Sequence, residues 1–326
     1  MPAALAERFR ERLPLTASTP IVSLGEGSTP LLIAPRLSKA LGAEIWLKLE
    51  GANPTGSFKD RGMTIAVSKA LEDGVDAVVC ASTGNTAASA AAYAARAGLR
   101  CLILQPAGAV AAGKLAQARA SGASVLEVRS PFDEVLSAAR ELSGRGTHAL
   151  VNSLNPYRIE GQKTAAFEIV DELGAPPDVL VLPYGGGGNT KAYFRGFDEL
   201  SVGLPRIIAA ESNVRSQTFA SAIRIADPVH AADVAAALDT SRGAVVSVSE
   251  DAILDAWRKL AQEEGVFCEP ASAASVAALL LAELPRGARV VCVITGHGLK
   301  DPETVTQLTP PPKIVDPDPD EIAGAA

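Results

Sequence analysis

Short apolar runs alternate along this chain with alanine-rich stretches of helical length, and this alternation constrains the fold more than any other feature of the sequence. The strand-like runs lie at 76–81, 100–104, 124–128, 178–183, 206–210, 244–248 and 289–294. The helix-like stretches lie at 85–97, 114–121, 132–142, 160–173, 189–200, 250–264 and 271–284. A strand followed by a helix and another strand is the βαβ unit of a parallel sheet. The sequence therefore predicts an α/β protein with mainly parallel sheets flanked by helices.

The length of the chain predicts two lobes. Its 326 residues exceed the size at which one hydrophobic core usually keeps growing. No Pro/Gly/Ser-rich linker separates two halves, so composition alone places no boundary. The tail at 310–326 begins with three prolines, is acidic and lacks apolar periodicity, so we expect it to lie along the surface or to be mobile.

A lysine, Lys59, follows a turn rich in small and hydroxyl residues at 53–58. Asn53, Thr55 and Ser57 are residue types that cap helix N-termini, so Lys59 is expected near the start of a helix. The orphan N–H groups and the dipole of such a helix favour an anion. This setting suits a lysine that forms a Schiff base with a phosphorylated aldehyde cofactor. The alternative is a surface lysine in a capped loop.

Two further segments have the pattern of a strand, a turn and a helix. One is 81–86, which reads Ala-Ser-Thr-Gly-Asn-Thr, and the other is 185–189, which reads Gly-Gly-Gly-Gly-Asn after an apolar run. Consecutive glycines let backbone N–H groups converge on an oxyanion with no Cβ in the way. The glycine segment is therefore predicted to bind a phosphate group.

Charge and composition narrow the classes of partner and the compartment. The net charge of −7 and the absence of a Lys/Arg cluster argue against nucleic-acid and membrane partners, so a small-molecule substrate is expected. No apolar run approaches the roughly 18 residues of a membrane span, and the first 15 residues lack the apolar core of a signal peptide. A cytoplasmic protein is expected.

The cysteines and histidines do not suggest a metal site or a disulfide framework. Cys80, Cys101, Cys268 and Cys292 are widely separated, form no C-x-x-C pair and mostly lie in apolar strand-like runs. They are expected to be buried reduced thiols. With only three histidines in the chain, no metal centre is expected.

Five segments together give the chain a resemblance to a known family. They are 53–63, 81–86, 151–164, 269–275 and 295–302, and they occur in the family's order over nearly the whole chain. The chain resembles fold-type II pyridoxal-phosphate (PLP) enzymes, the tryptophan synthase beta-like family, and within them it most resembles the threonine synthases. The first two segments are shared in looser form with threonine dehydratases and cysteine synthases, whereas the third and fifth are specific to threonine synthases.

The resemblance implies a division of the chain into lobes. Residues 61–148 would form a smaller mobile lobe, and residues 1–60 and 149–326 a larger PLP-binding lobe. In this family the smaller lobe moves over the larger one. The resemblance also implies a homodimer.

The resemblance assigns groups to each part of PLP. Lys59 would hold the aldehyde carbon covalently, Asn85 would donate to the phenolic oxygen, and Thr295 would hydrogen-bond the pyridine nitrogen. The residues expected at the cofactor are Phe58, Lys59, Asn85, Gly185, Gly186, Gly187, Gly188, Asn189 and Thr295, with the glycines and Asn189 at the phosphate. A threonine cannot hold the pyridinium proton by charge, which moderates the electron sink. The alternative for Thr295 is a strand-end hydroxyl that caps its own turn.

The substrate-binding residues are expected on two segments. Ser82, Thr83, Asn85 and Thr86 open a helix and would hold an α-carboxylate. Asn152, Ser153 and Arg158 supply the amide, hydroxyl and bidentate cation that a substrate phosphate needs. The alternative for Arg158 is an ion pair with Glu160 or Asp60 at a lobe hinge.

The resemblance implies the reaction of a PLP-dependent lyase of threonine biosynthesis. O-phospho-L-homoserine and water would give L-threonine and phosphate by γ-elimination and β-addition, with Lys59 as the catalytic base. Two segments depart from the threonine synthase pattern: 185–189, which is closer to dehydratases, and 204–230, which is short. They leave open a threonine/serine deaminase or a β-replacement enzyme acting on an O-activated serine. A non-catalytic relative also remains open, as does a nucleotide-binding module that uses the glycine run, although the run lacks G-x-G-x-x-G spacing.

Overall fold

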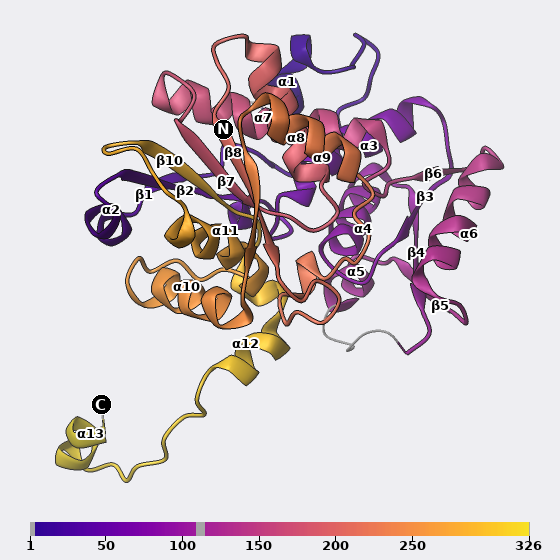
Figure 1. Ribbon diagram of the computed structural model, residues 1–326. Helices are drawn as coiled ribbons and strands as arrows, with labels where there is room; N and C mark the ends of the chain where they lie inside the picture. Colours follow the sequence, from indigo (N-terminus) through magenta and orange to yellow (C-terminus); the bar gives the residue numbers. More distant parts are fainter. Residues whose placement is uncertain (1–3, 109–114, 326) are drawn as a thin grey trace.

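The computed structural model, which describes residues 4–108 and 115–325, contains two mainly parallel sheets flanked by helices (Figure 1). The larger sheet has the strand order β1 (Leu31–Ile33), β2 (Glu44–Leu49), β10 (Arg289–Ile294), β7 (Val179–Pro183), β8 (Arg206–Ser212) and β9 (Ala244–Val248). The smaller sheet has the order β5 (Ser124–Val128), β4 (Arg100–Pro106), β3 (Ala77–Ala81) and β6 (His148–Leu150). Every described pair of neighbouring strands is parallel except β1 and β2. The expected two-lobed α/β fold is confirmed.

Helices connect the strands of each sheet. Those between residues 4 and 173 are α1 (Leu5–Arg8), α2 (Pro35–Leu41), α3 (Lys59–Glu72), α4 (Asn85–Ala97), α5 (Ala116–Ala120), α6 (Phe132–Gly144) and α7 (Pro156–Leu173). The later ones are α8 (Gly188–Leu200), α9 (Ala231–Thr240), α10 (Glu250–Gln262), α11 (Pro270–Leu281), α12 (Pro302–Leu308) and α13 (Pro319–Ala325). The helix expected at 114–121 corresponds to α5, and residue 114 itself lies outside the described residues.

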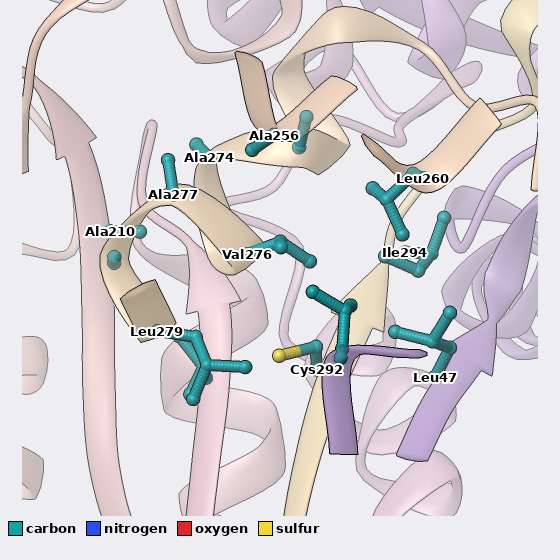
Figure 2. Packing of buried hydrophobic residues seen from close by; sticks show 14 of the residues in the cluster. Leu47, Ala210, Ala256, Leu260, Ala274, Val276, Ala277, Leu279, Cys292 and Ile294 are labelled. Carbon is teal, nitrogen blue, oxygen red and sulfur yellow. The ribbon is translucent and has the colours of Figure 1, made fainter. Parts of the chain in front are cut away.

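The larger sheet is covered on both faces because alternate residues of each buried strand point to opposite sides. Leu180 and Leu182 of β7 pack with residues of α7, α8 and α9. Val179 and Val181 of the same strand pack with residues of α10 and α11. Figure 2 shows the second layer, where alanine and leucine side chains of α10 and α11 gather over β10. The core of this lobe is therefore formed on both sides of the sheet.

The smaller sheet follows the same rule. Val78 and Cys80 of β3 pack with α3 and α4, whereas Val79 and Ala81 pack with α6. All four cysteines are buried and free, as expected. Burial raises the pKa of the Cys80 thiol to about 12, so this side chain behaves as a small apolar residue.

Helices α3 and α7 cross at very short range between the two lobes. A Cβ on Gly161 of α7 would lie 1.9 Å from the carbonyl oxygen of Arg61, and one on Gly62 of α3 would lie 2.5 Å from the carbonyl oxygen of Arg158. Only glycine allows such an approach of two backbones. The crossing joins the first turn of α3 to the first turns of α7.

A buried ion network surrounds this crossing. The Arg61 guanidinium, 1% exposed, donates to the carboxylates of Glu50 at 2.7 Å and Glu168 at 2.6 Å. Glu168 also pairs with the buried ammonium of Lys48 at 2.9 Å. Burial alone would raise the pKa of Glu168, but its ion pairs with Arg61 and Lys48 outweigh burial and lower it. The start of α3 is therefore fixed to the larger lobe by charge as well as by packing.

The C-terminal tail leads away from the body of the molecule and ends in α13 (Figure 1). Ile314 is fully exposed and Ile322 about half exposed, so the tail buries little apolar surface. Its few apolar side chains give it little to pack with, and the expectation that this segment lies along the surface or is mobile stays a prediction. Among the described residues, no helix has both the length and the apolar character needed to cross a membrane.

Candidate active site

A cavity of about 520 Å³ opens at the carboxyl ends of β3, β7 and β10, where strands of both sheets meet. Loops that follow parallel strands converge at this edge of an α/β sheet. The sequence-predicted residues that line the cavity are Phe58, Lys59, Ser82, Thr83, Asn85, Thr86, Asn152, Ser153, Gly185, Gly186, Gly187, Gly188, Asn189 and Thr295. Arg158 does not line it. The structure thus places the predicted residues, apart from Arg158, in one cavity.

Lys59 is the first residue of α3, as expected near a helix N-terminus, but the expected caps are wrong. The N-cap is Phe58, and no side chain caps the helix. Thr55 instead donates from its hydroxyl and its backbone N–H to Asp60, at 2.6 and 2.7 Å. The Asp60 carboxylate lies inside the first turn. A hydrogen bond from Thr55 to this carboxylate is stronger than one that Thr55 would accept from a helix N–H group. The turn is held by Asp60 and by a backbone bond from Phe58 N to Thr295 O at 3.0 Å.

The Lys59 side chain is half-buried in the cavity wall, and its pKa is lowered to about 7. Burial is the largest cause, the positive charge of Arg158 lowers the pKa further, and the Glu269 carboxylate opposes both. Near neutral pH a large fraction of Lys59 is therefore the neutral amine. A neutral amine can act as a nucleophile and as a proton acceptor.

The glycine segment connects β7 to α8. Gly187 has a φ of +87°, and a Cβ there would lie 2.8 Å from Cγ2 of Val234. The backbone therefore requires glycine both for its conformation and for space. Nearby, Asn189 Nδ2 and Thr190 Oγ1 are buried and have no hydrogen-bond partner within the described chain. Unpaired donors at a helix N-terminus fit an anionic group such as a phosphate.

Asn85 and Thr295 meet at a carboxylate that sequence reasoning did not assign. Glu269 lines the cavity, is 3% exposed, and accepts from Asn85 Nδ2 at 2.9 Å and from the Thr295 hydroxyl at 3.3 Å. A signal was present in the sequence, because Glu269 precedes a proline and the uniformly small and apolar helix at 270–281. A helix that is apolar on all sides is expected to be buried. Glu269, at the start of this helix, is then expected to be buried with it.

The first turn of α4 presents the other predicted polar groups. The helix begins at Asn85 after Gly84, and the Ser82 hydroxyl accepts from Gly84 N at 3.3 Å. Ser82, Thr83 and Thr86 line the cavity at this helix N-terminus. The positive end of the helix dipole and these hydroxyls suit a carboxylate.

Arg158 is fully buried but lacks a counter-ion. Its Nη1 donates to the Val151 carbonyl oxygen at 2.8 Å, while Nε and Nη2 are buried with no partner in the described part of the chain. The alternative ion pairs are not formed, since Asp60 binds Thr55 and Ser89, and Glu160 pairs with Lys163 and Arg195. Burial lowers the pKa of Arg158 to about 10, so the guanidinium stays charged at neutral pH. An unpaired buried cation favours an incoming anion.

Asn152 and Ser153 line the cavity on a loop held by side-chain contacts. The Asn152 carboxamide bonds in both directions to the backbone of Ala81, at 2.9 and 2.8 Å. His230 Nε2 lies 3.1 Å from the Ser153 carbonyl oxygen. His230 also packs against the glycine segment, and its backbone N–H donates to Gly186 O at 3.1 Å. His230 thereby connects the glycine segment to the loop at 152–153.

Other cavity-lining residues were not predicted. They include Gln162 on the wall and, on the rim, Phe132, Asp133, Leu136, residues 221–227 and Val229. The rim residues come from α6 of the smaller lobe and from the loop between β8 and α9 of the larger one. The backbone at these positions does not require a particular residue type, as it does in the glycine segment. The sequence therefore gives no indication that these residues line the cavity.

Comparisons with known proteins agree with this geometry. The sequence pattern of the family described as "Pyridoxal-phosphate dependent enzyme" matches residues 22–296. The chain is 50% identical over 319 residues to threonine synthase from Halalkalibacterium halodurans, covering 92% of this chain and 90% of that protein. It is 49% identical over 332 residues to threonine synthase from Mycobacterium tuberculosis, covering 95% and 92%. The fold is similar to maize serine racemase, with a TM-score of 0.74 at 22% identity over 86% of this chain and 90% of that one.

Proposed function

The chain belongs to the pyridoxal-phosphate dependent enzyme family and, within it, to the threonine synthases, and we propose that its cavity carries out the threonine synthase reaction. O-phospho-L-homoserine and water enter, and L-threonine and phosphate leave. The observation that carries the proposal is the buried guanidinium of Arg158, whose Nε and Nη2 have no partner among the described residues, beside Lys59, whose pKa is about 7. A substrate that brings its own phosphate supplies the missing acceptor.

Family membership confirms the expected PLP cofactor, and the cavity fits it. Lys59 would hold it covalently, and the N–H groups of Gly185 to Asn189 would hold its phosphate, where unpaired donors await an anion. Asn85 would donate to its phenolic oxygen and Thr295 would hydrogen-bond its ring nitrogen. Phe58 contributes an apolar wall; its ring centroid lies 4.3 Å from Lys59 Nζ.

The residues of this chain divide the work between binding and proton transfer. Bound PLP supplies an electrophilic aldehyde and an electron sink for charge that develops on the substrate carbons. Lys59 Nζ takes and returns protons at substrate Cα and Cβ, because it is buried at the cavity wall and neutral near pH 7. Ser82, Thr83 and Thr86 orient the α-carboxylate at the start of α4.

The substrate phosphate would bind near Arg158, Asn152 and Ser153. Gln162 lines the cavity and lies close to Arg158. A Cβ added to Gly62 would lie 2.9 Å from Nε2 of Gln162 and 2.7 Å from Nε of Arg158. Arg158, Asn152 and Ser153 would bind the phosphate and stabilise the charge it gains when it leaves Cγ. Asn152 keeps one N–H for this purpose, because its other contacts hold Ala81.

We further propose how the molecule is organised around this reaction. Residues 61–148 would be the smaller mobile lobe and would close over the substrate, which excludes bulk water until water is required. The chain would act as a homodimer in the cytoplasm, with no nucleic-acid partner. The acidic net charge of −7 supports the last point, and the exposed Leu32 and Ile33 of edge strand β1 support self-association.

A substrate panel tests the proposal. Purified protein loaded with PLP is given O-phosphohomoserine, O-phosphoserine, threonine and serine, and release of phosphate, threonine and ammonia is measured. We expect phosphate and threonine to be released together from O-phosphohomoserine. Faster turnover of unphosphorylated threonine or serine would show a deaminase and overturn the proposed function.

Arg158→Met sharpens the panel. Removing a charge-assisted contact to phosphate should lower kcat/KM for O-phosphohomoserine roughly a hundredfold, which corresponds to a loss of about 3 kcal/mol in transition-state stabilisation. Arg158→Lys should recover only part of this because a lysine cannot bind in a bidentate manner. PLP affinity, compared at about pH 9 where Lys59 is largely neutral in both proteins, should stay within twofold of wild type, and an exposed arginine on α2, changed as Arg36→Met, serves as the matched control. An equal loss of PLP affinity would place Arg158 at the cofactor.

A further inference from the structure

Glu269 is a buried carboxylate in the cavity that the reaction as proposed above does not use. It is the N-cap of α11, yet its side chain makes no capping hydrogen bond to that helix. An N-terminal carboxylate normally bonds to the first N–H groups of its own helix. Here it turns toward the cavity instead, so another interaction holds it.

The backbone of Gly296 leaves room for this carboxylate. A Cβ on Gly296 would lie 2.5 Å from both Cδ and Oε1 of Glu269. The two residues are also joined by the backbone, since Glu269 N donates to Gly296 O at 3.0 Å. The carboxylate is thus fixed against the strand end that carries Thr295.

The two oxygens of Glu269 bind groups from different elements. Oε2 accepts from Asn85 Nδ2 at the start of α4, 184 residues away in sequence, and Oε1 accepts from the hydroxyl of Thr295 after β10. Thr295 Oγ1 lies 2.9 Å from Ser272 Oγ, which itself accepts from Gly296 N at 3.0 Å. Glu269 therefore links the two groups that are proposed at the phenolic oxygen and at the ring nitrogen of PLP.

Hydrogen-bond chemistry gives this link a direction. Glu269 accepts at both oxygens, so it fixes the Asn85 carboxamide with its NH₂ group toward Glu269 and leaves one N–H free for another acceptor. Thr295 has one hydroxyl hydrogen, which it donates to Glu269 in the cofactor-free protein, so Glu269 holds this side chain beside the position of the ring nitrogen until PLP takes over the hydrogen bond. Without it, the carboxamide can rotate by half a turn and place its oxygen where a donor is needed.

Resting on the proposed roles of Asn85 and Thr295, we propose that Glu269 is a positioning residue that orients both side chains toward the PLP ring. It touches the ring only through these two partners. Its burial, the space left by Gly296 and its two hydrogen bonds are the observations that support the role.

Cofactor binding tests the role without substrate. Glu269→Gln keeps the size of the side chain but offers one acceptor and one NH₂ group, so it cannot accept from both partners. The variant is prepared without cofactor and titrated with PLP, and the visible absorption band of the bound cofactor is recorded. We expect the Kd for PLP to rise at least tenfold and the band to shift. A Kd within twofold of wild type with an unchanged band would overturn the proposal.

A double-mutant cycle with Asn85→Ala identifies the route. If Glu269 acts through Asn85, the effect of Glu269→Gln on PLP affinity should shrink at least threefold in the Asn85→Ala background. Fully additive effects would overturn the positioning role. Should Glu269→Gln fail to fold, Glu269→Asp gives the same reading, because the shorter side chain keeps the charge but cannot reach both partners.

A buried carboxylate outside the cavity serves as the matched control. Glu26 is 3% exposed and accepts from Ser23, Leu24 and Tyr93. Glu26→Gln should lower the melting temperature but leave the PLP titration and the absorption band unchanged. A similar loss of PLP affinity in both variants would overturn the proposal, since the effect would then be one of stability. Because these measurements use no substrate, a failed substrate panel leaves their outcome standing.

Discussion

Lys59 shows how burial sets the chemistry of one side chain. The lysine lies at the start of α3 with Arg158 nearby, and burial and this neighbouring charge together bring its pKa to about 7. The cost of burying the Arg158 guanidinium, and any protonated Lys59 beside it, is high unless an anion enters. The free protein is therefore prepared to bind anions, which both the cofactor and the proposed substrate provide.

The rate at which the cofactor-free protein attaches PLP should follow the titration of Lys59. Only the neutral amine attacks an aldehyde, so the rate should be nearly constant above about pH 8 and fall about tenfold per pH unit well below pH 7. Because the charge of Arg158 lowers this pKa, Arg158→Met should move the midpoint to higher pH. Stopped-flow absorbance measures the rate, with Arg36→Met as the control. An unmoved midpoint would show that Arg158 does not act on Lys59.

The sequence predicted some site residues better than others for a physical reason. The glycine run and the turn before Lys59 impose backbone requirements that restrict residue type locally, so a short segment indicates the function. Glu269 acts through Asn85, which is 184 residues away, and through Thr295. Nothing in the sequence near Glu269 reports such partners, and only the buried helix after it hints that the acid is enclosed.

Among the elements, the crossing of α3 and α7 has most influence on the site. Lys59 is the first residue of α3 and Arg158 lies in the first turn of α7. The glycines at the crossing place the two backbones in contact, and the ion pairs of Arg61 lock them. The backbone positions from which the amine and the guanidinium extend are consequently fixed.

Gly161→Ala should destabilise the protein strongly. The added methyl group would lie 1.9 Å from the carbonyl oxygen of Arg61, and backbone cannot move aside as a flexible side chain can. We expect a loss of about 3 kcal/mol or more in the free energy of unfolding, measured by chemical denaturation. Gly144→Ala in α6 is the control, because the new Cβ meets no described atom within 4 Å and should gain up to about 1 kcal/mol. Equal effects of the two changes would contradict the close crossing.

The sequence also predicted elements unequally. The expected bounds of β5, β9 and β10 agree with the structure, because these strands are short apolar runs with clear ends. Strands β1, β2 and β6 were missed. In β2, Lys48 interrupts the apolar pattern, yet its ammonium is fully buried against Glu168. The sequence alone does not distinguish a lysine that is buried in an ion pair, such as Lys48, from a lysine that is exposed to solvent.

At the scale of the whole molecule, Lys300 joins the two lobes. Its ammonium donates to the Thr55 carbonyl oxygen at 2.9 Å and to Gln117 Oε1, on α5 of the smaller lobe, at 2.6 Å. The aliphatic part of the Lys300 side chain packs over Gly56, since a Cβ added to Gly56 would lie 3.0 Å from Cδ of Lys300. One side chain thus connects the segment after β10, the turn before Lys59 and a helix beside the smaller sheet.

Lys300→Met should loosen the smaller lobe without unfolding the protein. The methionine keeps most of the apolar stem over Gly56 but removes the donor to Thr55 and Gln117. We expect faster hydrogen exchange in residues 116–128, measured by mass spectrometry, with little change in the strands of the larger sheet. Lys39→Met on the exposed face of α2 is the control. Unchanged exchange at 116–128 would show that this contact does not hold the lobes together.

The crossing of α3 and α7 also bears on how such an enzyme can diversify. Since the amine and the guanidinium are carried by main chains in contact, most substitutions at the crossing should destabilise the protein, and the reacting centre should change least readily. Variation is left to the rim, where Phe132, Asp133 and the 221–227 loop face the cavity without comparable constraint. Laboratory selection for longer, shorter or uncharged substrates should therefore enrich changes at the rim and leave the crossing untouched.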